Sequence, residues 1–327
     1  MWVTRGRHSV DSPRSPSYRP ARAVTSATRG IADAQAPRSA PRHPLLFTAV
    51  SAVCFAFMAL CAKLSTRELS GSQVAFVRFL LMLLPVVLVP RFRRRALEFR
   101  RLDLLVYRGF FGGVAVLLYF LAIAHVPVGI ATLLNYSSPV FSVFFAALFL
   151  GERADRRLLL PAALALVGVV LAAGLDPGRG ARFHLGVWEL AGIASSVLSG
   201  VAVTAIRAAR RTESSWSIYG SFTLFGLLAT APFGLLSWRP PAPREWLLLA
   251  GVGAASVVAQ LLMTYAYRWV TNLQAGVTAQ LTVVGSMLLG AGFLGERLTP
   301  LQLAGSALAV GGVVAVVWLQ STPRAVE

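Results

Sequence analysis

Charge is scarce in this chain of 327 residues, and most of it has one sign. Asp, Glu, Lys and Arg make up 13% of the sequence, where a typical soluble domain has about 25%. The basic residues number 31 and the acidic ones 13, and Lys63 is the only lysine. Such an excess is common in proteins that bind nucleic acid, but here the basic residues are scattered through loops between apolar runs. We therefore expect no nucleic-acid partner.

Cysteine is scarce as well. Cys54 and Cys61 both lie in the first apolar run, where a helix would place them on one face but too far apart to form a disulfide. The chain also lacks a zinc-binding spacing, a Gly-x-Ser-x-Gly motif and paired aspartates within its apolar runs. These absences argue against an intramembrane enzyme, and we expect no cofactor and no metal site.

Apolar residues, in contrast, make up 56% of the chain. A helix of about 20 apolar residues crosses the roughly 30 Å of hydrocarbon in a bilayer. The apolar runs are this long, and most connections between them are short. The sequence therefore predicts an all-α membrane protein with ten transmembrane helices, at about 45–64, 72–90, 104–124, 127–150, 158–175, 185–206, 215–236, 246–267, 273–294 and 299–319.

The loops predict how these helices are oriented. Basic residues concentrate in alternate segments, which include residues 1–43, 91–101, 153–157 and 207–211. Loops rich in Lys and Arg stay on the cytoplasmic side of a membrane. We therefore predict a multi-pass protein of the inner (cell) membrane with both termini in the cytoplasm.

Residues 1–43 differ from the rest of the chain. They are rich in Arg, Ser, Pro and Ala and show no apolar period, so we predict a disordered basic cytoplasmic tail. An organellar transit peptide and a mis-called start site are the alternatives. The remaining chain divides into a first five-helix repeat at 44–175, a second at 185–319, and a cytoplasmic C-terminal tail at 320–327.

The division into two halves comes from a repeat with a shift of 144 residues. Phe149–Arg153 recurs as Phe293–Arg297, with Phe-Leu-Gly-Glu-Arg in both places, and Gly168–Val170 recurs as Gly312–Val314. Each half holds five predicted spans, and an odd number makes the second half enter the membrane from the opposite side. The chain is therefore predicted to be two inverted five-helix repeats, an arrangement that suits alternating access.

These residues resemble the drug/metabolite transporter superfamily, EamA type. The shared features are Gly-Glu-Arg after the fourth and ninth spans, glycine-rich fifth and tenth spans, Val77-Arg78-Phe79 and Pro139, and the resemblance covers about 45–319. It implies a carrier, since members are similar to exporters and importers of amino acids, nucleotides, vitamins and drugs. The halves differ at Phe222, the counterpart of Arg78, and at Val283, the counterpart of Pro139, so a site between them should be asymmetric.

Arg78 is the first candidate for binding a solute. It lies inside the second predicted span, where a charge costs about 2.5–3.5 kcal/mol on insertion scales. It either contacts an anionic or polar group of the solute or extends to the membrane interface. Arg108, near the cytoplasmic end of the third span, is expected to extend to the cytoplasmic headgroups.

A second candidate region is Asn135-Tyr136-Ser137-Ser138-Pro139 in the fourth span. Pro139 removes one backbone hydrogen bond and frees the carbonyl of Asn135. Freed backbone inside a membrane is either buried in protein or lines a cavity, so Asn135, Tyr136 and Ser138 are candidate solute ligands, with helix packing as the alternative. Further candidates are Tyr119, Tyr265, Gln280 and Thr282.

The repeated Gly-Glu-Arg residues are predicted to be structural. They are Gly151, Glu152, Arg153, Gly295, Glu296 and Arg297. An acid at the C-terminal end of a helix is disfavoured by the helix dipole. We therefore expect each Glu to bind the adjacent Arg or a neighbouring loop and so to define the end of its helix.

The sequence thus predicts a membrane carrier, an exporter or exchanger, for a small polar, zwitterionic or anionic metabolite. Its partners would be this solute and the lipid bilayer. Glu189 is the only acid within a predicted span, and it lies near the outer end of that span, so no Asp or Glu lies at mid-membrane. Proton-coupled carriers commonly use buried carboxylates or His, so we expect facilitated exchange or uniport. The alternatives are a multidrug-type exporter of lipophilic compounds and a membrane scaffold that transports nothing.

Overall fold

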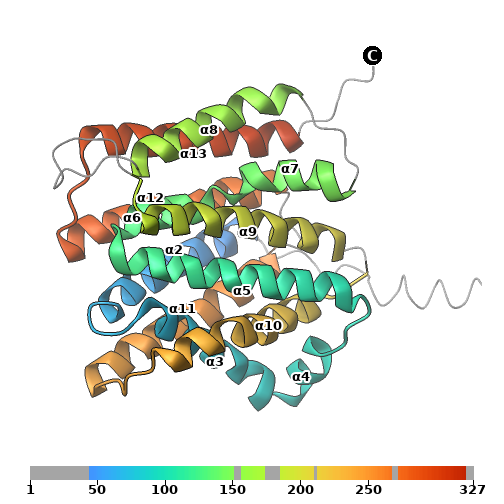
Figure 1. Ribbon diagram of the computed structural model, residues 1–327. Coiled ribbons are helices and arrows are strands. Elements are labelled where there is room, and N and C mark those ends of the chain that lie inside the picture. Colours follow the sequence, from blue (N-terminus) through green and yellow to red (C-terminus); the bar gives the residue numbers. More distant parts are fainter. Residues whose placement is uncertain (1–43, 151–155, 174–184, 210–211, 267–271, 322–327) are drawn as a thin grey trace, which may run out of the picture. The chain divides into compact units, whose positions relative to one another are not determined.

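The protein is helical throughout the part that the computed structural model describes, which is residues 44–150, 156–173, 185–209, 212–266 and 272–321 (Figure 1). The helices are α2 (Pro44–Ser65), α3 (Gly71–Leu88), α4 (Pro90–Ala96), α5 (Leu102–His125), α6 (Val128–Tyr136), α7 (Ser138–Leu150), η1 (Arg156–Leu158), α8 (Leu159–Ala173), α9 (Val187–Ala209), α10 (Ser215–Leu236), α11 (Pro243–Ala266), α12 (Asn272–Leu294) and α13 (Pro300–Ser321).

Eight of the described helices are long and apolar enough to cross a membrane, namely α2, α3, α5 and α9 to α13. The other two predicted spans correspond to α8, a shorter apolar helix, and to the pair α6 and α7. The all-helical prediction is therefore confirmed for the described residues. The count of ten spans stays a prediction.

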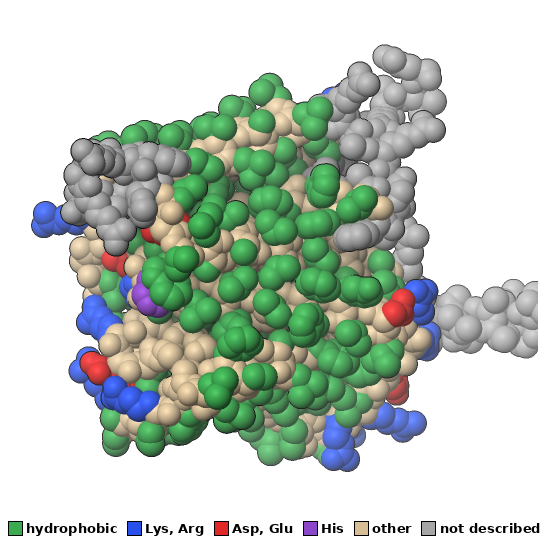
Figure 2. Space-filling view, in the orientation of Figure 1, with side chains coloured by type: hydrophobic (Ala, Val, Ile, Leu, Met, Phe, Trp, Pro, Cys, Tyr) green, Lys and Arg blue, Asp and Glu red, His purple; other side chains and the backbone are tan. Residues whose placement is uncertain are grey.

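Apolar side chains cover the middle of the face shown in Figure 2, and charged side chains gather at its two ends. Many large apolar residues are exposed, such as Leu236 at 87% and Leu247 at 74%. A water-soluble protein rarely exposes so much continuous apolar surface. This distribution is the one that a lipid bilayer requires.

A contact between α8 and α13 occurs twice, with the two partners swapped by the 144-residue repeat. Gly168 in α8 lies so close to Ala309 in α13 that a Cβ atom would collide with its backbone, and Gly312 lies in the same way against Ala165. The repeat pairs Gly168 with Gly312 and Ala165 with Ala309. Equivalent residues of the two halves therefore make reciprocal contacts.

The starts of two helices repeat as well. The hydroxyl of Ser70 caps α3 by accepting a hydrogen bond from the Gln73 amide, and Ser214 caps α10 in the same way through Ser217. These caps satisfy one of the amides left free in the first turn of a helix. Ser70 and Ser214 are also 144 residues apart, so the repeat extends to how the helices begin.

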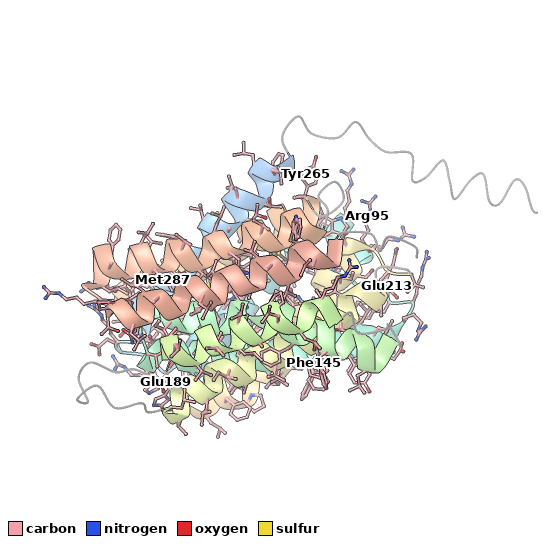
Figure 3. The ribbon with its side chains drawn as sticks, turned by 90° about the horizontal axis from the view of Figure 1, so that it is seen from above. Arg95, Phe145, Glu189, Glu213, Tyr265 and Met287 are labelled. Atoms are coloured by element: carbon pink, nitrogen blue, oxygen red, sulfur yellow. The ribbon has the colours of Figure 1, made fainter. Side chains whose placement is uncertain are left out.

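The two ends of the helix bundle differ in which helices begin and finish there. At one, the Lys63 end, α2, α5 and α12 finish and α6 begins, whereas at the other, the Phe47 end, α2 starts and α11 finishes. Phe47 and Tyr265 meet at the Phe47 end, with ring centroids 5.5 Å apart. Figure 3 shows Tyr265 on the same side as Arg95 and Glu213, and Glu189 on the other side.

Candidate functional site

The fourth predicted span is broken near its middle. α6 ends at Tyr136 and α7 begins at Ser138, because Pro139 has no amide hydrogen to continue the helix. The Val140 amide donates to the Ser137 carbonyl at 3.1 Å, which leaves the Tyr136 carbonyl to accept from Gln280 Nε2 at 3.5 Å. The counterpart α12 is continuous, and it has Val283 where α7 has Pro139.

Arg78 lies inside the bundle and does not reach its surface. The side chain is 3% exposed, and its Nε donates to the hydroxyl of Ser256 in α11 at 2.9 Å. The guanidinium also lies 5.1–5.8 Å from the ring centroids of Phe79, Phe120 and Phe222. Among the described residues, its Nη1 is buried and has no hydrogen-bond partner. A buried donor in this state is uncommon and suits a site that a ligand completes.

Arg108 corrects a prediction, because it is buried rather than extended to the interface. The side chain is 8% exposed, and its guanidinium carbon lies 4.0 Å from the centroid of the Phe222 ring. Gly112, one turn further along α5, has no side chain and leaves the space that the guanidinium fills. The cation–π contact with Phe222 and this space draw Arg108 inward.

Three phenol groups surround the Arg78 guanidinium closely enough to interact with it electrostatically, those of Tyr119, Tyr136 and Tyr219. Tyr119 forms a hydrogen bond of 2.9 Å with Thr132. The Tyr219 hydroxyl donates to the Met82 carbonyl at 2.8 Å. Of the predicted site residues, Tyr119 and Tyr136 are therefore brought together with Arg78.

A small pocket of about 30 Å³ lies beside Tyr136 and extends toward the Phe47 end. Ligand pockets for small molecules are usually about 300–1,000 Å³, so in this conformation the pocket is too small to hold a metabolite. Sequence analysis missed Thr48 and Ser51, although their spacing of three places them on one face of an apolar helix. The lining residues are Thr48, Ser51, Ala52, Phe55, Tyr136, Met263, Thr278, Ala279 and Thr282.

The other candidate residues have different positions. Asn135 donates to the hydroxyls of Ser195 at 2.5 Å and Ser199 at 3.3 Å, which are contacts between α6 and α9. Thr282 lines the pocket and donates to the Ala52 carbonyl at 3.3 Å. The structure does not bring Tyr265 to the pocket, because its side chain is 46% exposed and contacts Phe47.

Ser138 is half-buried at the start of α7, directly after the break. The first copy of the repeated motif, Gly151, Glu152 and Arg153, lies outside the described residues.

Residues that the repeat makes equivalent meet each other at this site. Arg78 contacts the ring of its own counterpart Phe222, and Tyr136 accepts a hydrogen bond from its counterpart Gln280. The site therefore lies where the two halves face each other, and its two sides differ chemically.

The second Gly-Glu-Arg motif lies at the Lys63 end. Gly295 has a φ of 67°, a left-handed conformation that glycine adopts without strain and that ends the helix. Glu296 follows, and its carboxylate accepts hydrogen bonds from the Val128 amide at 3.0 and 2.9 Å. Burial raises the pKa of this carboxyl above its ordinary value, against the opposing effects of that amide and Lys63. Arg297 is exposed.

The sequence profile of the EamA-like transporter family matches residues 43–174 and again residues 186–318. The chain belongs to this family. Like other EamA-like proteins it is a membrane transporter with two repeats. Among the described residues, no group of three His, Cys, Asp or Glu side chains could hold a metal ion.

Several curated relatives are similar over much of the chain. The pseudopaline exporter CntI of Pseudomonas aeruginosa PAO1 is 29% identical over 83% of this chain and 95% of its own. The probable terminal-alkyne amino-acid exporter of Streptantibioticus cattleyicolor is 32% identical over 59% of this chain and 65% of its own. One crystal structure of a protein superposes on 86% of this chain and 98% of its own with a TM-score of 0.57 at 20% identity, a likeness in fold.

Proposed function

We propose that the protein exports a small zwitterionic or anionic metabolite, of amino-acid type, through the site between its two repeats. The observation that carries this proposal is the buried Arg78, whose Nη1 has no hydrogen-bond partner among the described residues. A carboxylate accepts charge-assisted hydrogen bonds from a guanidinium. The exporters among the relatives, one of which is named for an amino acid, support the same class of solute.

The aromatic rings around Arg78 suit this role. Phe79, Phe120 and Phe222 exclude water from the guanidinium, and an electrostatic contact is stronger where water is excluded. A carboxylate that reached Nη1 would also approach the phenol groups of Tyr119 and Tyr136, which can donate hydrogen bonds to it. The site thus offers donors and positive charge to an anion, and apolar surface to the rest of the solute.

The transport cycle in this proposal is alternating access between inverted repeats. Counting α8 and the pair α6 and α7 as spans gives each half five spans and both termini in the cytoplasm. The Phe47 end then faces the cytoplasm, and the pocket extends toward that end. In this arrangement solute enters from the cytoplasm and leaves at the Lys63 end after the halves have exchanged conformations.

Exchange or uniport is the expected energetic mode. In the described spans, the acidic residues are Asp103, Glu189 and Glu245, and each lies in the first turn of its helix. None of these is part of the pocket. A proton pulse into proteoliposomes should therefore fail to drive uphill accumulation of solute. Uphill accumulation that is lost in Glu189→Gln would contradict this mode.

A ligand screen tests the proposed solute class directly. The purified protein would be melted in the presence of amino acids, nucleotides, vitamins and lipophilic cations. A ligand that binds only the folded protein at 100 times its Kd stabilises it by about 2.7 kcal/mol, so an amino acid or related carboxylate should raise the melting temperature. Stabilisation by lipophilic cations alone would favour a multidrug exporter, and intact protein with neither binding nor flux would favour a scaffold.

Replacing Pro139 should weaken solute binding without unfolding the protein. In Pro139→Ala, an amide hydrogen returns and the helix can continue across 136–138, which removes the Tyr136 carbonyl from Gln280 and shifts Tyr136 in the pocket. We expect a several-fold rise in the Kd of the solute found by the screen, measured by titration. Pro232→Ala, which changes a proline inside α10 away from the pocket, should leave the Kd unchanged.

A further inference from the structure

Two charged side chains hold the turn between α5 and α6 from opposite sides. Lys63 in α2 donates from Nζ to the carbonyls of Ile123 and Val126, both at 2.8 Å. Glu296, just after α12, accepts from the amide of Val128, the first residue of α6. Three helices and the segment after a fourth therefore meet at this one turn.

The charges match the helix ends that they touch. The last carbonyls of a helix carry partial negative charge and the first amides carry partial positive charge. The Lys63 ammonium binds the end of α5, and the Glu296 carboxylate binds the start of α6. The two side chains also lie close enough to attract each other electrostatically.

Close backbone packing lies beside this cluster. A Cβ atom on Gly129 in α6 would collide with Met287 in α12, and one on Gly290 in α12 would collide with Glu296 and Val128. One turn into α6, Thr132 is fully buried and bonded to Tyr119. These glycine contacts bring α6 and α12 close together between Tyr136 and the Lys63 end, whereas the pocket extends from Tyr136 toward the Phe47 end.

We propose that Lys63 and Glu296 are positioning residues that hold the Lys63 end closed in this conformation, and that their contacts with the α5–α6 turn break when solute leaves at that end. This inference rests on the proposed export function. Both side chains are half-buried, and the cost of removing their charges from water is recovered only while the contacts with the turn keep good geometry. Polar contacts of this kind are therefore better suited than purely apolar packing to a closure that opens in every transport cycle.

The accessibility of a buried thiol tests the closure. In a background of Cys54→Ala and Cys61→Ala, Thr132→Cys places one thiol between the cluster and the pocket. A membrane-impermeant thiol reagent applied to whole cells should label it slowly. Adding Glu296→Gln or Lys63→Met should raise the labelling rate at least tenfold, and Lys63→Arg, which keeps the charge, should restore slow labelling.

Glu68→Gln is the matched control. Its carboxylate lies at the same end of the bundle, but it is exposed and 3.6 Å from Arg239, so labelling should stay slow. Gel filtration and melting curves would confirm that each variant is folded. If Glu296→Gln does not fold, the comparison rests on Lys63→Met. Folded variants with unchanged labelling from outside, or with faster labelling only in inverted vesicles, would overturn the proposal. Since labelling needs no solute, a protein that failed to export would still give this result.

Discussion

Arg78→Met is expected to abolish selective export of the amino-acid-type solute while the protein stays folded. Methionine keeps much of the apolar contact with Phe79, Phe120 and Phe222 but removes the donors that a carboxylate would bind. A hydrogen bond to a charged group contributes about 1.5–3 kcal/mol, so the Kd should rise by roughly tenfold to a hundredfold. The measurement is binding by titration, followed by export from inside-loaded vesicles.

Arg108→Met provides the matched comparison, because Arg108 is also a buried arginine against the same Phe222 ring. Arg108→Met is expected to lower the melting temperature but to leave the Kd of the solute nearly unchanged. Arg78→Lys should recover part of the affinity, since it keeps the charge but not the planar pair of donors. Equal affinity in wild type and Arg78→Met would remove the basis for an anionic or zwitterionic solute.

Gly312→Leu is expected to destabilise the membrane domain more than Arg78→Met, Arg108→Met or Pro139→Ala. A Cβ atom at Gly312 would collide with the backbone of Ala165, and backbone cannot move aside as a flexible side chain can. Overpacking of a tight interface costs about 1–3 kcal/mol and sometimes more. The free energy of unfolding should fall by at least that amount, measured by thermal or denaturant unfolding in detergent.

The neighbouring glycine is a close control. A Cβ atom at Gly311 has no atom within 4 Å, and leucine there adds an apolar side chain to an apolar helix. Gly311→Leu should therefore unfold at the wild-type temperature, whereas Gly168→Leu should behave like Gly312→Leu because its contact is the reciprocal one. Equal melting of Gly311→Leu and Gly312→Leu would show that α8 and α13 do not pack closely in the membrane.

The sequence was enough to place most helices, because length and apolar content decide where a chain can cross a bilayer. It also singled out Arg78, Tyr136 and Thr282 as candidates, since polar groups in apolar runs are costly and stand out. Pro139 predicted a freed carbonyl at Asn135, but not the division of the span into α6 and α7 or the contact of the Tyr136 carbonyl with Gln280. Each of the predicted features depends on residues that are neighbours along one helix.

The features that sequence reasoning missed depend on partners far along the chain. Arg108 turns inward because Phe222 lies against it on another helix. Glu296 was expected to bind Arg297 or a neighbouring loop, and the sequence did not show that its partner would be the amide of Val128, at the start of α6 and 168 residues earlier. Ser256, which orients Arg78, is 178 residues away from it. No local pattern distinguishes these residues from ordinary packing residues before the helices are assembled.

The contact between Arg78 and its counterpart Phe222 also has a consequence for how such a protein can evolve. Two identical five-helix subunits would place the same residue on both sides of the axis. With arginine on both sides, two guanidinium groups would face each other in a medium that screens charge poorly, and with phenylalanine on both sides the proposed donor to the solute would be lost. An arginine that faces a phenylalanine at this contact requires that the two halves differ in sequence, as they do at Arg78 and Phe222.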